Sequence, residues 1–231
     1  MRPTSLAALA VVLLPAAAAA QQEPPTLRVQ GAGEVRVAPD QATVLLGVLA
    51  EAPTAGAAQA DASRRAGAAL EALRGLGLDD RVVQTGRLTL NPVYTNPRPG
   101  GPATISGYRA ANTLSIRIEA IDQVGDVIDA ALRAGANELR GVSFGLADEA
   151  PFREEALRLA IAEARGKANA MAGALGVSLA GILSVNEDNV FVQRPAMELG
   201  RVMAMQAEPS TPVAPGEVTV SAGVSIAYRI E

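Results

Sequence analysis

One pentapeptide has the letters of a hydrolase nucleophile. Residues 141–145 read Gly-Val-Ser-Phe-Gly, which fits the G-x-S-x-G pattern in which a serine attacks a carbonyl carbon. That chemistry needs a sharp turn between strand and helix at the serine, and a histidine that takes its proton. The flanking residues Val142 and Phe144 instead place Ser143 inside a strand, and the chain has no histidine. We therefore interpret the match as coincidental.

The remaining catalytic candidates are one lysine and several carboxylates. Lys167 is the only lysine, so a serine–lysine dyad or a Schiff base has a single candidate. It follows Glu163 by four residues on an expected helix, which favours a surface ion pair. Acid–base hydrolysis by a carboxylate pair stays open, because sequence positions give no geometry. The carboxylate candidates are Asp40, Asp122, Asp129, Asp148 and Glu149.

Three further patterns have weaker chemical meaning. Residues 31–33 (Gly-Ala-Gly) begin like a dinucleotide-binding fingerprint, but Arg36 stands where the third glycine belongs, which predicts a bulged strand. Residues 186–189 (Asn-Glu-Asp-Asn) carry oxygen ligands of the kind calcium prefers, yet their spacing favours a plain turn. Tyr94 and Tyr108 flank a loop rich in Pro and Gly, where they either stack on a ligand or pack against a sheet. We assign no catalytic, cofactor-binding or metal-binding residue.

The composition excludes several classes of site. The 231 residues include no cysteine and no histidine, so no Ser-His-Asp or Cys-His centre, imidazole- or thiolate-bound metal, or disulfide can form. The chain is 49% hydrophobic but only 3% aromatic, so Ala, Val and Leu must fill its core. Its net charge of −4 gives no attraction for nucleic acid or anionic lipid.

The first twenty residues (1–20) have the three parts of a secretory signal peptide. Arg2 supplies the positive charge, an apolar run follows, and alanines precede a cleavage point between Ala20 and Gln21. An uncleaved membrane anchor is the alternative, but a run of about nine residues is short of the roughly 20 that span a bilayer. We expect residues 21–231 to form one exported, soluble, periplasmic domain of two lobes, without a membrane span.

Hydrophobic periodicity predicts an α+β fold, because segments of period two alternate with segments of period 3.6. The expected order is ββαββαβαββ. Its middle part, βαββαβ, is the order of a ferredoxin-like lobe, and the first strand, the long helix and the C-terminal strands make a second sheet-and-helix layer. Strands are expected at residues 27–37, 42–49, 82–94, 110–118, 142–146, 179–185 and 218–230, and helices at 57–76, 122–135 and 151–175.

The long helix is expected to bury one stripe of mostly large apolar side chains. The stripe comprises Leu157, Ile161, Ala164, Ala168, Met171 and Leu175. On the opposite face, Glu154–Arg158 and Glu163–Lys167 lie four residues apart in the favourable acid-first order. In the shorter helix, Asp122 is expected to cap the start, and Gly135 to end it.

Six short segments carry a family resemblance. They are Gly31-Ala32-Gly33-Glu34-Val35 with Ala38-Pro39-Asp40-Gln41-Ala42, Gly107-Tyr108-Arg109-Ala110 with Asn112, Ile128-Asp129-Ala130, Gly135-Ala136-Asn137, Gly141-Val142-Ser143-Phe144, and Lys167-Ala168 with Leu175-Gly176. In this order they resemble the SIMPL domain family (the former domain of unknown function 541), over about Leu27 to Ile230. That family includes periplasmic immunogenic proteins and an oxidative-stress-defence protein of enteric bacteria. The resemblance implies an exported α+β protein that tends to form ring-like or channel-like homo-oligomers, with no established catalytic residues.

Three functions are consistent with these features. The first, which we expect, is a non-enzymatic periplasmic or envelope protein that works without a cofactor as a homo-oligomer, with a role in stress tolerance. The second is an envelope module that binds a small ligand or a client protein through residues 91–107 and a flexible segment at 187–216. The third is a hydrolase that uses carboxylates or Ser143 with Lys167. Three methionines of the second segment either form an adaptable contact surface or belong to a mobile loop: Met197, Met203 and Met205.

Overall fold

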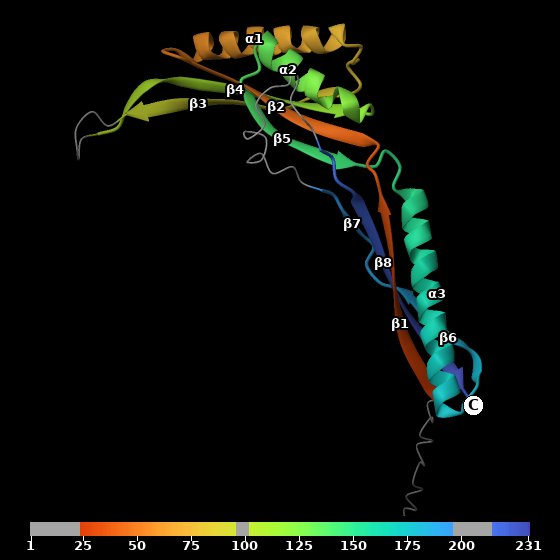
Figure 1. Cartoon of the computed structure of the whole chain (residues 1–231). Coiled ribbons are helices and arrows are strands. Elements are labelled where there is room, and N and C mark those ends of the chain that lie inside the picture. Colours follow the sequence, from red (N-terminus) through yellow and green to blue (C-terminus); the bar gives the residue numbers. More distant parts are fainter. Residues whose placement is uncertain (1–23, 96–101, 196–213) are drawn as a thin grey trace, which may run out of the picture.

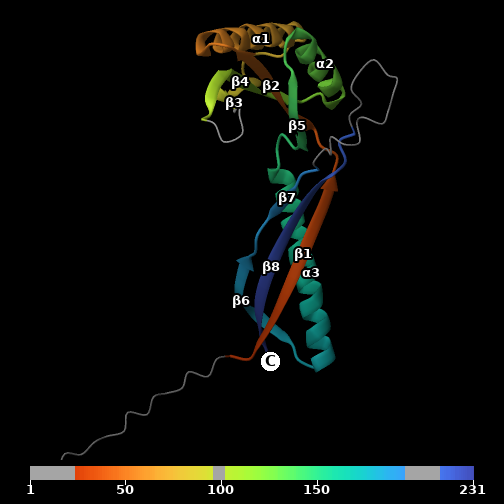
Figure 2. The same ribbon diagram turned by 90° about the vertical axis from the view of Figure 1, so that its left-hand side faces the viewer.

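The computed structural model describes residues 24–95, 102–195 and 214–231. They form two units, each with an antiparallel sheet: two helices cover one face of the first sheet, and a single helix covers one face of the second (Figures 1 and 2). The α+β fold predicted from the sequence is confirmed. Within these residues, no helix combines the length and the apolar character needed to cross a membrane.

The first unit has the predicted βαββαβ order of a ferredoxin-like fold. Its sheet order is β3-β4-β2-β5, so β4 separates β2 from β3 and β2 separates β4 from β5. Helices α1 and α2 lie side by side on one face of this sheet (Figure 1). The elements are β2 (Gln41–Ala52), α1 (Ala55–Gly75), β3 (Val83–Thr95), β4 (Thr104–Ile118), the 3-10 helix η1 (Ile121–Gln123), α2 (Val124–Ala134) and β5 (Glu138–Gly145).

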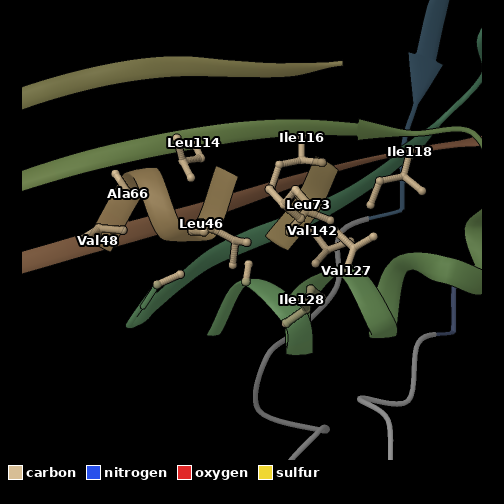
Figure 3. Close-up of a cluster of buried hydrophobic side chains, with 14 of the residues drawn as sticks. Leu46, Val48, Ala66, Leu73, Leu114, Ile116, Ile118, Val127, Ile128 and Val142 are labelled. Atoms are coloured by element: carbon tan, nitrogen blue, oxygen red, sulfur yellow. The ribbon is translucent and has the colours of Figure 1, made fainter. Parts of the chain in front are cut away.

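The core of the first unit follows from two periodicities. Alternate residues of β2 and β4, such as Leu46 and Leu114, point toward the helices because side chains alternate between the faces of a strand. Helix α1 buries residues spaced three or four apart against this face, including Ala66 and Leu73. Figure 3 shows these side chains meeting Ile128 of α2 in one buried cluster.

The second unit combines the start and the end of the chain. Its sheet order is β1-β8-β6, and a short strand, β7, also pairs with β8. Helix α3 runs along one face of this sheet (Figure 2). β7 was not predicted; it lies in the segment 187–216, which was predicted to be flexible. Residues 196–213 of that segment, with the three methionines, lie outside the described residues. The elements are β1 (Thr26–Val37), α3 (Ala150–Leu175), β6 (Leu179–Glu187), β7 (Phe191–Gln193) and β8 (Val218–Ile230).

The backbones of β1 and α3 touch at two glycines. A Cβ atom on Gly31 would lie 2.0 Å from the carbonyl oxygen of Ala160, and one on Gly33 would lie 1.9 Å from that of Ala156. The predicted bulge at these glycines is wrong, because β1 pairs with β8 in an uninterrupted register. The glycines are present because only residues without a side chain permit this close approach.

The buried stripe of α3 therefore differs from the predicted one. Its fully covered residues are five alanines spaced four apart: Ala156, Ala160, Ala164, Ala168 and Ala172. Of the predicted large members, Leu157 is half-buried, while Ile161, Met171 and Leu175 are exposed, Leu175 by 64%. Larger residues do not fit where the helix lies this close to the sheet, so they occupy its flanks.

Local contacts confirm some of the expected helix features and change others. Glu163 and Lys167 form the expected ion pair at 3.0 Å, whereas Arg158 pairs with Glu155 instead of Glu154. Asp122 lies inside η1 and does not cap α2, whose first turn has no side-chain cap. Gly135 ends α2 with a φ of +134°, a value that favours glycine.

Replacing Gly31 by Ala tests the backbone contact between β1 and α3. The new methyl group would collide with helix backbone, which cannot yield as a side chain can, so we expect a loss of about 3 kcal/mol of unfolding free energy. Gly166→Ala is the matched control, because Gly166 is an exposed residue of α3 with open space around it. This control should stabilise the protein by about 0.5–1 kcal/mol. Urea unfolding of both variants measures the effect, and a Gly31→Ala variant as stable as the parent protein would contradict it.

Candidate functional site

The serine and the lysine of the hydrolase hypothesis lie in different units. Ser143 is inside β5, opposite Thr43 of β2, so the G-x-S-x-G match has no turn at its serine. Lys167 lies on α3, where its Nζ contacts Glu163 and donates a hydrogen bond to the carbonyl oxygen of Gln30 (3.1 Å). The structure therefore does not bring Ser143 and Lys167 together as a dyad.

The carboxylate candidates mostly bond to backbone or to arginine. Asp40 accepts a hydrogen bond from a backbone N–H of the β5–α3 connection (2.7 Å), and Asp148 accepts one from the first N–H of α3 (2.9 Å). Both lie at the junction of the two units. Asp122 and Asp129 are in η1 and α2 of the first unit. Asp40 and Asp148 thus hold chain connections in place, as capping carboxylates do.

Glu149 holds Arg194 in place at the junction of the two units. It forms ion pairs with Arg153 (2.6 Å) and Arg194, and its side chain is only 17% exposed. Arg194 follows β7 and also lies against Gly145 at the end of β5, where an added Cβ would be 3.4 Å from its Nε. Hydrogen bonds from Arg153 and Arg194 lower the pKa of Glu149. A general acid near neutral pH needs a raised pKa, so the environment of Glu149 suits a structural ion pair instead.

Two asparagines from the segments that carry the family resemblance lie within or beside the first sheet. Asn137 completes the edge of β2 beyond β5, because its amide accepts from the N–H of Leu49 (2.7 Å) and donates to the carbonyl of Leu49 (2.8 Å). Asn112 of β4 is buried between Val48 and Leu88, and its Oδ1 has no hydrogen-bond partner among the described residues. A buried carbonyl of this kind is a place where an ordered water commonly binds.

The β3–β4 hairpin carries exposed apolar side chains. Much of the expected loop at 91–107 is strand, since β3 continues to Thr95 and β4 begins at Thr104; residues 96–101 lie outside the described residues. The end of the hairpin lies beyond the first turn of α1, which leaves it uncovered (Figure 1). Tyr108 is half-buried against the core, whereas Tyr94 is 60% exposed. We call the exposed set the arm surface: Leu88, Leu90, Tyr94 and Ile105.

A second apolar surface lies on β6. Helix α3 packs on β1 and β8 and barely touches β6, so eight of the nine residues of β6 are exposed. Ile182 is 61% exposed and Val185 is 52% exposed. The sequence predicted this strand but not its exposure, because the register and the position of α3 decide which strands are covered. We call Ile182, Leu183 and Val185 the β6 surface.

The other face of the second sheet is polar and open. A shallow hollow of about 780 Å³ is lined by residues of β1, β6, β8 and the flank of α3. Residue 186, from the calcium-like stretch 186–189, contributes to this hollow, while Asp188 accepts a hydrogen bond from Ser225 (3.1 Å). Within the described ranges, no group of three or more acidic residues gathers in a way that could hold a metal ion. The polar residues that line the hollow include Arg28, Gln30, Lys167, Ser184, Asn186 and Ser225.

Comparison with known proteins identifies the family. The SIMPL family profile, described as a protein of unknown function (DUF541), matches residues 27–228. The chain belongs to the SIMPL family. The 26 kDa periplasmic immunogenic protein of Brucella melitensis is 29% identical over 221 residues, which cover 90% of this SIMPL chain and 86% of the relative. The uncharacterized protein YggE of Edwardsiella ictaluri is 30% identical over 163 residues, 71% of this chain and 68% of the relative.

The lowered pKa of Glu149 makes the stabilisation from its ion pairs with Arg153 and Arg194 dependent on pH. A carboxylate with a depressed pKa stabilises the folded state above its unfolded pKa of about 4.3, and this contribution is lost as the pH falls through the folded value. We expect Glu149→Gln to lower the unfolding free energy by about 1 kcal/mol at pH 7, and the difference from the parent to shrink toward pH 3.

Glu155→Gln is the control for this measurement. Glu155 lies in α3, the helix that begins directly after Glu149, and it also pairs with an arginine, Arg158, but this pair is exposed to solvent. Exposed pairs contribute little, so this variant should unfold close to the parent protein at both pH values. A Glu149→Gln effect of equal size at pH 7 and pH 3 would show that the charge of Glu149 does not support the junction.

Proposed function

We propose that this SIMPL protein is an exported, non-enzymatic protein of the bacterial periplasm that works as a homo-oligomer. The observation that carries the proposal is the exposure of large apolar side chains on two separate surfaces, the arm surface and the β6 surface. Burying one such side chain is worth roughly 1.5–3 kcal/mol. Grouped apolar side chains on a surface typically mark contacts with other proteins.

Two separate surfaces favour an assembly of more than two copies. A chain with one self-complementary surface forms a closed pair, and a second contact joins such pairs into larger closed assemblies. The arm surface and the β6 surface lie in different units, well apart along the molecule (Figure 1). Both can therefore be occupied by neighbouring copies at the same time.

The location and the non-enzymatic role have separate support. The Brucella melitensis relative is named a periplasmic protein, and the first twenty residues of this chain have the pattern of a signal peptide. The catalytic candidates have surroundings that suit a structural role. Ser143 lies inside a paired strand, and Lys167 and Glu149 form ion pairs. A role in stress tolerance is supported by the family resemblance alone.

Light scattering of the mature chain, from Gln21 onward, tests the assembly. We expect one discrete mass of several subunits that stays constant over a broad range of protein concentration, because burial of two apolar surfaces stabilises the assembly. A monomer at every concentration would overturn the proposal.

Binding of an apolar client segment is a second candidate function. The observation that favours it is the exposure of Tyr94 and Ile105 as a cross-strand pair at the end of the arm. The double variant Tyr94→Ser, Ile105→Ser separates the two functions. Client binding predicts an unchanged native mass and a loss of protection of an unfolded apolar test protein against aggregation. A smaller native mass in this variant than in the parent protein would show that the arm surface is part of the contact between subunits.

A further inference from the structure

The sheet of the second unit has two edges, and side chains close one of them. At the centre of β1, the N–H of Ala32 donates to Oε2 of Glu163 (2.5 Å), and the carbonyl oxygen of Gln30 accepts from Nζ of Lys167 (3.1 Å). These backbone groups point away from β8 and are the ones that a neighbouring strand would use. Another strand cannot pair with the middle of β1 without breaking both hydrogen bonds.

The opposite edge, at β6, is open. Within the described part of the chain, no side chain hydrogen bonds to the backbone of Leu179–Glu187. The strand is nine residues long and its only charged residue is Glu187, at its end. Its pairing with β8 shifts register between Leu179 and Gly181 and again between Ile182 and Ser184, and it is regular from Ser184 to Glu187. A largely apolar edge with a single charge and no cover is the kind that soluble proteins normally avoid, because it invites strand pairing.

We propose that β6 pairs in antiparallel fashion with β6 of a second copy, across a two-fold axis, so that the two sheets become one. This inference rests on the proposed homo-oligomer and names one of its contacts. Ile182 and Val185 pair with Tyr228 and Ile226 of β8, and therefore lie on the α3 side of the sheet. In the paired sheet, these side chains from the two copies lie on the same face and cover one another.

The closed edge explains why the occupant is a second copy. If both edges were open, β6 of one copy would pair with β1 of the next, and this head-to-tail contact would continue as an open filament. Closure of β1 by Glu163 and Lys167 removes that route. Pairing of β6 with β6 of a second copy uses the open edge of both copies at once, so no open edge remains for a third copy.

The charge of Glu187 favours the antiparallel direction. Parallel pairing in register would place the two Glu187 carboxylates side by side, and like charges directly opposite on neighbouring strands are destabilising. Antiparallel pairing centred near Leu183 separates them by roughly 25 Å, at about 3.3 Å per residue. The remaining residues of β6 are uncharged, so they add no charge repulsion in either direction.

Single cysteines test this contact directly, because the natural chain has none. The variants Ile182→Cys, Leu183→Cys, Ser184→Cys and Val185→Cys place one thiol along the exposed strand, and Arg28→Cys on β1 is the exposed control. A residue at the two-fold axis faces its own copy at disulfide distance. We expect at least one β6 variant to form a disulfide-linked dimer roughly a hundredfold faster than Arg28→Cys, because a fixed neighbour presents millimolar thiol against micromolar protein.

Native mass, measured before oxidation, separates the possible failures. Rapid cross-linking confined to neighbouring β6 positions supports the pairing. If the protein is oligomeric but every β6 variant cross-links as slowly as Arg28→Cys, the pairing is wrong while the proposed homo-oligomer stands. If the protein is a monomer, the proposed function fails and the pairing fails with it.

Discussion

The close contact between α3 and β1 determines the arrangement of the second unit. Gly31 and Gly33 let the helix backbone approach the strand, and only alanines fit on the helix face that meets the sheet. A helix held this closely lies over β1 and β8 and does not extend over β6. Its larger residues, such as Met171 and Leu175, remain on exposed flanks. The exposure of β6 is therefore a consequence of the glycine–alanine contact.

The same contact closes the other edge of the sheet. Because α3 lies so near β1, the side chains of Glu163 and Lys167 reach the outward-facing backbone groups of Ala32 and Gln30. One edge is thus protected and the other is available, which is how a sheet limits association to a single contact. The first unit adds its own uncovered surface on the β3–β4 hairpin. Arg194, held by Glu149, lies beside Gly145 at the end of β5, where the two units meet.

Most of the fold could be predicted from periodicity, and the errors have a common cause. Alternation and 3.6-residue spacing located nearly every strand and helix, and the order of elements indicated the ferredoxin-like unit. The buried stripe predicted for α3 was wrong because a hydrophobicity pattern favours Ile161 and Met171 over alanine. The distance between the backbones of α3 and β1 decides which residues fit. Close approach also accounts for Gly31 and Gly33, which sequence reasoning assigned to a bulge. The exposure of Ile182 and Val185 has no sequence signal of its own, because it depends on where α3 lies.

The most direct test of this account is amide hydrogen exchange of the two edge strands as a function of protein concentration. The N–H of Ala32 should be protected at every concentration, since Glu163 accepts its hydrogen bond within the same chain. The outward-facing amides of β6 should exchange rapidly in dilute protein and become protected as the copies associate. Rapid exchange along β6 under conditions where the protein is fully assembled would contradict the account.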